Sequence, residues 1–248
     1  MRQSAGGWAV SRARIEQGLR DPLTLSGVAI DLLPVAAVML WGWGSSQLVL
    51  LYWLENLVIG AFAVVRILLS GLPLGMAGLL IGTGFGAFFL VHYFFFCAGH
   101  GTFLFVFMSF RDGMTDIPLM DLPAMARAAL ASGEGMALMV LLVALWHLAE
   151  LFLRFIAGRG YERSNPLAEM VAPYSRIAVL HVALFAGFAL LLSVGDPMLG
   201  VLMLILGRAL WGFVSRTPKG QPAQNEPSQK AIAEALAQLN ALLARRRP

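Results

Sequence analysis

Hydrophobic residues occur along this chain in long continuous runs separated by short polar segments. The runs cover residues 27–43, 47–69, 74–110, 135–156, 177–194 and 198–214. A helix needs about 20 predominantly apolar residues to cross a hydrocarbon core of about 30 Å. The pattern therefore predicts an all-α protein, a polytopic transmembrane helix bundle with about six spans. Its transmembrane domain would comprise residues 27–214.

The third run, residues 74–110, is too long for a single perpendicular crossing. At about 1.5 Å per residue it would extend about 55 Å as one helix. It must therefore tilt, kink or project beyond the bilayer. We expect one long helix, and the alternative is two half-helices that meet near Gly99.

The segments outside these runs have distinct compositions. Residues 1–26 form a basic arm without the features of a cleavable signal peptide. Residues 111–134 form an acidic loop, in which 123–131 is expected to be a short interfacial helix. Residues 215–230 have the composition of a flexible linker. Residues 231–248 are expected to form an amphipathic basic helix that lies on the membrane or contacts a partner subunit.

Composition supports a membrane protein and indicates its orientation. The chain is 58% apolar and only 13% charged, about half the charged share of soluble domains, which is about 25%. The net charge of +4 comes from basic residues in the tails and between the runs, a pattern typical of membrane orientation rather than of nucleic-acid binding. With six spans, the basic segments share one side, so we predict a bacterial inner-membrane protein with both termini in the cytoplasm.

Charged residues near the ends of two spans are interpreted as topological. Asp31 follows the start of the first run by four residues, and Arg208 lies in the sixth run. We expect Asp31 to snorkel or to cap its helix, and Arg208 to lie near the inner end of its span.

Ionisable residues inside the apolar runs are the most informative feature of the sequence. An ionised group at the bilayer centre costs about 2.5–3.5 kcal/mol on insertion scales, so we expect these side chains to converge in the bundle interior. Histidine with carboxylate suits zinc or iron, and a metal-bound water would supply a hydroxide nucleophile. The predicted metal ligands are Glu55, His92, His100, His147 and His181.

The spacing of these residues limits how they can combine. His92 and His100 lie about 12 Å apart along a helix and about 80° apart around it, so they cannot bind one ion unless the helix breaks. His147 and Glu150 share one helix face. Haem ranks below a bare metal ion because no attachment motif is present. The single cysteine, Cys97, excludes a disulfide framework or a zinc–cysteine site within one chain.

Several functions remain open at this point. The first is a metal-binding membrane protein, with a hydrolase of lipid-linked substrates as one form of it. The second is a proton-coupled transporter or channel in which Glu55 and the histidines relay protons. The third is an accessory subunit that docks through residues 231–248. The polar residues could also serve only as interhelical hydrogen bonds. No P-loop or serine nucleophile motif is present.

Four motifs resemble a bacterial membrane family catalogued as domain of unknown function 6498. They are Leu51-Tyr52-Trp53-Leu54-Glu55-Asn56, Val91-His92-Tyr93, Gly99-His100-Gly101 and the stretch from Ala172 to His181. The resemblance covers roughly residues 30–213 and implies a multi-span protein, without an assigned activity. The residues expected to surround the metal ligands are Asn56, Tyr93, Glu150, Tyr174 and Arg176.

Overall fold

The structure is a computed structural model in which the described residues form helices joined by short turns. It describes residues 12–112, 120–175, 177–178 and 197–216, and the isolated positions 234, 237 and 238. Residues 179–194 of the expected fifth span, residues 217–230 of the expected linker 215–230 and nearly all of the expected C-terminal helix lie outside this part of the chain. Positions 215 and 216 are helical, so the linker does not begin at 215. No strand occurs among the described residues, so the all-α prediction is confirmed.

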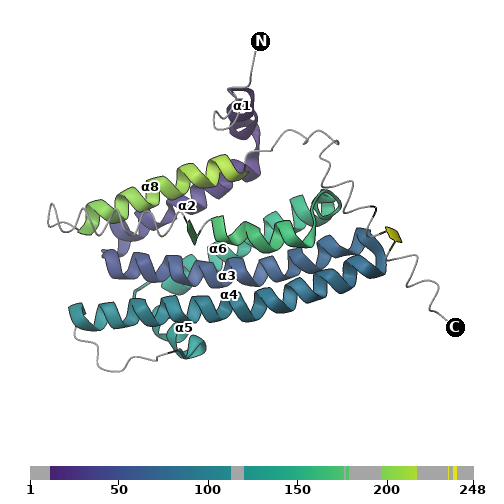
Figure 1. Cartoon of the computed structure of the whole chain (residues 1–248). Coiled ribbons are helices and arrows are strands. Elements are labelled where there is room, and N and C mark those ends of the chain that lie inside the picture. Colours follow the sequence, from purple (N-terminus) through teal and green to yellow (C-terminus); the bar gives the residue numbers. More distant parts are fainter. Residues whose placement is uncertain are drawn as a thin grey trace, which may run out of the picture.

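The helices run in this order: α1 (Arg12–Arg20), α2 (Pro22–Trp41), α3 (Ser45–Gly71), the 3-10 helix η1 (Leu72–Leu74), α4 (Gly75–Asp112), α5 (Leu122–Leu130), α6 (Met136–Glu150), the π-helix η2 (Leu151–Ala157), the 3-10 helix η3 (Gly160–Arg163) and α8 (Pro197–Arg216). A further helix covers 166–175. In Figure 1 the long helices α2, α3, α4 and α8 extend in similar directions as a bundle.

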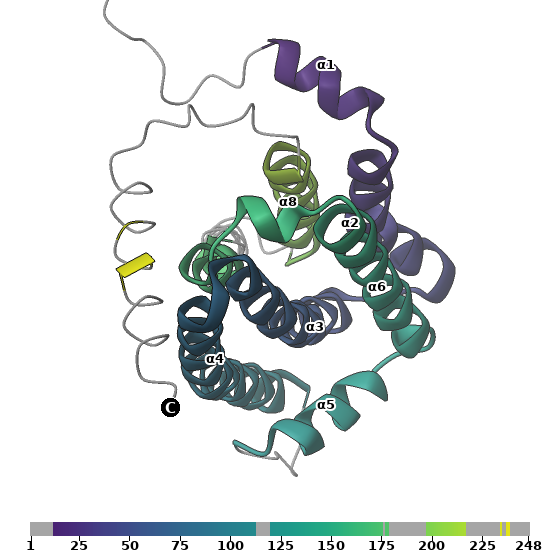
Figure 2. The same ribbon diagram turned by 90° about the vertical axis from the view of Figure 1, so that its right-hand side faces the viewer.

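Three of the described helices are long and apolar enough to cross a membrane. They are Pro22–Trp41, the continuous stretch Ser45–Val106, and Met136–Ala157. The second stretch contains η1, where the chain turns, so that α3 and α4 lie side by side as a hairpin (Figures 1 and 2). The expected total of six spans is not confirmed by the described residues. The expected sixth span lies within α8, which is not one of these three candidate spans.

The start of α2 differs from the prediction and changes the position of Asp31. The helix begins at Pro22, five residues before the expected start at Gly27. Asp21 is its N-cap, and its side chain accepts a hydrogen bond from the backbone N–H of Thr24 at 3.2 Å. Proline at the first helical position suits this start because its missing N–H would be unpaired there in any case. Asp31 therefore lies in the middle of α2, not near its end.

The hairpin of α3 and α4 is held by close packing and by hydrogen bonds between the two helices. Gly60 allows this approach, since a Cβ there would lie 2.5 Å from the ring of Tyr93. The Tyr93 hydroxyl donates to the backbone carbonyl of Asn56 at 3.1 Å. The indole N–H of Trp53 donates to the carbonyl of Cys97 at 2.9 Å. Small residues at helix contacts are typical of membrane bundles.

Helix α4 is continuous over all 38 residues from Gly75 to Asp112. This confirms the expected single long helix and excludes a break at Gly99. The short helix expected at 123–131 is also present, as α5. Its packing places Met125 and Ala129 in the main apolar core, together with Trp53 and Phe105.

Candidate functional site

A group of buried charged side chains lies between α2, α3 and α8. Asp31 on α2 is 2% exposed and Glu55 on α3 is 4% exposed. Arg208 and Arg216 reach them from α8. Two carboxylates thus meet two guanidinium groups, so their formal charges balance. We refer to Asp31, Glu55, Arg208 and Arg216 as the buried charge network.

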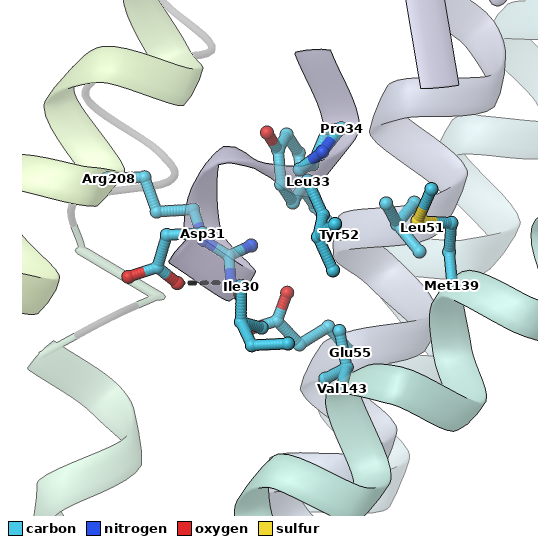
Figure 3. A pocket seen from close by; sticks show the side chains of 10 residues that line it. All are labelled: Ile30, Asp31, Leu33, Pro34, Leu51, Tyr52, Glu55, Met139, Val143 and Arg208. Atoms are coloured by element: carbon cyan, nitrogen blue, oxygen red, sulfur yellow. Dashed lines mark hydrogen bonds and ion pairs between the residues drawn. The ribbon is translucent and has the colours of Figure 1, made fainter. Parts of the chain in front are cut away.

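Arg208 connects the two carboxylates of the network. Its Nη2 forms an ion pair with the carboxylate of Glu55 and lies 3.4 Å from Oδ1 of Asp31. Figure 3 shows Arg208 extending from α8 toward Asp31, with their contact drawn as a dashed line. The guanidinium carbon lies 4.5 Å from the centre of the Tyr52 ring, which adds a cation–π contact.

Arg216 binds Asp31 from the end of α8. Its Nη1 and Nη2 donate to Oδ2 and Oδ1 of Asp31 at 2.5 and 3.1 Å. The guanidinium also lies over the ring of Trp146, 4.5 Å from its centre. Two parallel hydrogen bonds fix the orientation of both groups more strictly than a single contact would. Asp31 therefore accepts from both arginines, whereas Glu55 pairs with Arg208.

A small cavity adjoins the network. Its volume is about 10 Å³, which is about the space that one water molecule requires. Asp31, Tyr52, Glu55 and Arg208 line its polar part. The apolar lining residues are Ile30, Leu33, Pro34, Leu51, Met139 and Val143.

A second group of ion pairs lies at one end of the bundle. Arg154 forms an ion pair with Asp21, donates to the Thr24 hydroxyl at 2.9 Å and donates to the backbone carbonyl of Arg216 at 3.2 Å. Glu150 lies 4.0 Å from Arg154 and 3.8 Å from Arg66.

Arg66 extends this second group to the helix that follows η3. Its Nε donates to Glu169 at 2.9 Å. The contacts of Arg66 and Arg154 together place the start of α2 and the ends of α3, α6 and α8 at the same end of the bundle. We call it the basic end.

The predicted metal ligands lie in separate surroundings. Glu55 belongs to the buried charge network. The ring of His147 on α6 stacks on Phe62 at 5.9 Å, and its Nδ1 lies 3.8 Å from Glu150. The rings of His100 and Phe96 lie 4.3 Å apart on α4.

His92 contacts the helix that covers 166–175. Its Nδ1 lies 2.8 Å from the hydroxyl of Tyr174. Burial raises the pKa of that hydroxyl, so it stays protonated and can donate to the ring nitrogen. The ring of Tyr93 lies 5.9 Å from that of Tyr174. These three residues of the sequence motifs are therefore brought together.

The described residues do not support the expected histidine cluster. Among them, no three His, Cys, Asp or Glu side chains are placed to hold a metal ion. His92 and His100 lie on one unbroken helix. Their spacing along that helix therefore prevents them from binding the same ion. His181 and Arg176 lie outside the described residues. A metal site that includes His181 stays a prediction.

Asp31 and Arg208, which were expected to have only topological roles, belong to the buried charge network. The interpretation of Asp31 as a snorkelling or capping residue is wrong, because its carboxylate is buried and paired with two arginines. Arg208 lies in the middle of α8 rather than at its end. One signal was present in the sequence: Asp21 followed by Pro22 marks a helix start, which moves Asp31 to mid-helix.

Comparison with known proteins gives a family without an activity. The model of a family described as "Family of unknown function (DUF6498)" matches residues 16–234. No curated protein and no solved structure matches the chain. The matched region includes both the buried charge network and the ion pairs of the basic end.

Proposed function

The chain belongs to the family of unknown function DUF6498, and we propose that it is a membrane protein that couples proton binding at Glu55 and Asp31 to transport. The observation that carries this proposal is the position of Arg208, which bridges two buried carboxylates in the middle of an apolar bundle. This proposal develops the hypothesis of a proton-coupled transporter or channel in which acidic side chains within the membrane relay protons.

The energetic cost of the network argues against a purely structural role. Each ionised side chain at the membrane centre costs about 2.5–3.5 kcal/mol on insertion scales. Apolar residues of similar volume often stabilise a core as well as a buried ion pair does. If the helices needed only to pack against one another, apolar and small residues would be sufficient, as they are for α3 and α4 at Gly60. Ionisable groups retained at this depth mark ion pathways and proton relays.

The chemistry of the side chains suggests how coupling works. Arginine stays protonated under physiological conditions, so the carboxylates are the groups that gain or lose a proton. Protonation of Glu55 removes its charge and weakens its ion pair with Arg208. Arg208 then keeps Asp31 as its charged partner. Proton binding thereby changes the attachment of α8 to α3, which is the differential contact that a two-state transporter requires.

The size of the cavity favours a proton as the species handled at this site. Its volume of about 10 Å³ holds about one water molecule. A larger solute would need a different arrangement of the helices. The ion that is coupled at this site is therefore a proton.

The orientation follows from the basic end. Arg66 and Arg154 lie there with the start of α2 and the end of α8. Cytoplasmic segments of membrane proteins carry an excess of arginine and lysine. We therefore place the basic end in the cytoplasm of a bacterial cell, in its inner membrane, with both termini on that side.

The test is proton movement in liposomes that contain the purified protein. A pH-sensitive dye inside the liposomes reports proton entry after an external acid pulse, with an ionophore present to balance charge. Proton entry faster than in protein-free liposomes supports the proposal. Equal rates at all imposed gradients, with candidate solutes present or absent, contradict it.

A metal site is the second candidate, and one contact favours it. Nδ1 of His147 and Oε2 of Glu150 lie 3.8 Å apart on α6. The two side chains are close enough to bind one ion together with a ligand from another helix. A zinc or iron ion held there would support the hydrolase hypothesis. The metal content of the purified protein, measured by mass spectrometry, tests this candidate.

A further inference from the structure

The middle of α2 contains a proline that changes its backbone hydrogen bonding. Pro34 lies inside the helix. Because proline has no backbone N–H, it cannot donate to the carbonyl of Ile30, four residues earlier. Ile30 and Pro34 both line the small cavity beside the buried charge network. The cavity is therefore lined by the residue whose carbonyl loses its usual helical donor.

The hydroxyl group of Tyr52 is a buried hydrogen-bond donor at the same cavity, and it needs an acceptor. Tyr52 is 3% exposed and lines the cavity. Its hydroxyl has no hydrogen-bond partner among the described residues. In Figure 3 the hydroxyl oxygen is drawn beside Leu33 and Pro34 of α2. Leaving such a buried group unsatisfied costs about 1–3 kcal/mol, so a small polar ligand that satisfies it is favoured.

We propose that this cavity is a binding site for a single water molecule. The water accepts a hydrogen bond from the Tyr52 hydroxyl and donates one to the carbonyl of Ile30. The volume of about 10 Å³ matches one water, and buried waters typically make two to four hydrogen bonds. Larger ligands do not fit, and an apolar ligand would leave the Tyr52 hydroxyl unsatisfied.

The role of this water deepens the proposed function and rests on it. Asp31 and Glu55 line the same cavity, so a water bound there is next to both carboxylates. It offers a route by which a proton reaches or leaves Glu55 without passing through the arginines. Tyr52 is then a positioning residue, since it holds the water rather than the proton.

The chain provides a built-in reporter for this water. Met139 lines the cavity, whereas Met136, one helical turn earlier on α6, is fully buried and does not line it. X-ray radiolysis converts bound water into hydroxyl radicals, which oxidise neighbouring methionines. The full-length protein in lipid nanodiscs would be irradiated in water labelled with oxygen-18, and the label at each methionine read by mass spectrometry. We expect label at Met139 several-fold above that at Met136.

Two variants remove the two partners of the water independently. Tyr52→Phe removes the hydroxyl, and Pro34→Ala restores an N–H that bonds to the Ile30 carbonyl. Each is expected to lower the label at Met139 to the level of Met136. Tyr161→Phe, at η3 and away from the cavity, is the matched control and should leave the label unchanged. Alanine favours the helix more than proline does. A loss of label in Pro34→Ala would therefore not be explained by misfolding of α2.

The outcomes separate the water site from the proton-coupling proposal. Label at Met139 no higher than at Met136 in the wild type overturns the water site. So does Met139 label that persists in both variants. Glu55→Gln, which keeps the hydroxyl and the carbonyl, should keep the label and lose proton movement. Wild type that shows the label but moves no protons contradicts the proposed function and leaves the water site standing.

Discussion

Asp31 accepts two hydrogen bonds from Arg216, at 2.5 and 3.1 Å, across a separation of 185 residues in the sequence. This pair ties the first long helix of the bundle to the last described one. Arg208 adds a second contact from α8 to the same carboxylate. Asp31 is therefore the acid on which the attachment of α8 to α2 depends most.

Loss of the Asp31 carboxylate should strongly destabilise the protein. Asp31→Ala leaves Arg216 buried without its charged partner, and breaking a buried pair in this way typically costs about 3–5 kcal/mol. Chemical unfolding in detergent, followed by tryptophan fluorescence, measures the change in the free energy of unfolding. Glu162→Ala, which removes an exposed pair with Arg159, is the control and should leave the free energy of unfolding nearly unchanged, because exposed ion pairs contribute little to stability. Equal small effects of both substitutions would refute the structural role of Asp31.

The close approach of α8 to Asp31 requires glycine at position 212. A Cβ there would clash with Oδ2 of Asp31 and lie 2.6 Å from Nη1 of Arg216. We predict that Gly212→Ala destabilises the protein by about 1–3 kcal/mol through overpacking. Gly207 lies on the same helix with open space around its Cβ position, so Gly207→Ala should be neutral or stabilise by up to about 1 kcal/mol. The same unfolding assay compares them, and an equal response of both glycines would contradict the packing seen at Asp31.

Metal content should not depend on Glu55. The ion pair with Arg208 occupies this carboxylate, which argues against its predicted role as a metal ligand. We expect purified wild type and Glu55→Ala to carry the same amount of zinc or iron by mass spectrometry. Any stoichiometric metal should instead fall in His147→Ala or His181→Ala. Loss of bound metal in Glu55→Ala alone would restore Glu55 to the ligand set.

The orientation can be tested with single cysteines. Cys97 is the only cysteine and is buried, so its replacement by serine gives a cysteine-free background. Glu162 at the basic end and Ala131 at the end of α5 are both exposed. In intact bacterial cells, a membrane-impermeant maleimide should label Ala131→Cys and not Glu162→Cys. The opposite labelling would place the basic end outside the cytoplasm.

The continuous helices were predictable because their signal is local. Apolar runs of this length can satisfy their backbone in a membrane only as helices, so α3, α4 and α6 appear near their expected positions. The unbroken course of α4 past Gly99 follows from the same run. The π-helix at Leu151–Ala157 has no comparable signal in the sequence.

The buried charge network could be predicted only in part. Glu55 stands out as an acid inside an apolar run, and its function as a buried ionisable residue was anticipated. Its partner was not, because Arg208 lies 153 residues away and nothing local in the chain specifies which helices meet. Asp31 was misplaced for a local reason, since the start of α2 was set at Gly27 rather than at the cap formed by Asp21. The positions of helices relative to one another are a tertiary property.

Proton movement in liposomes containing Glu55→Gln shows whether the Glu55 carboxyl group carries the proton. This substitution keeps the size of the side chain and removes its ability to bind and release a proton. Glu150→Gln is the matched control, because Glu150 also lies near arginines but at the basic end, away from the cavity. We expect proton entry with Glu55→Gln to fall to the rate of protein-free liposomes, and Glu150→Gln to keep the wild-type rate. Wild-type proton movement in Glu55→Gln would contradict this role of Glu55.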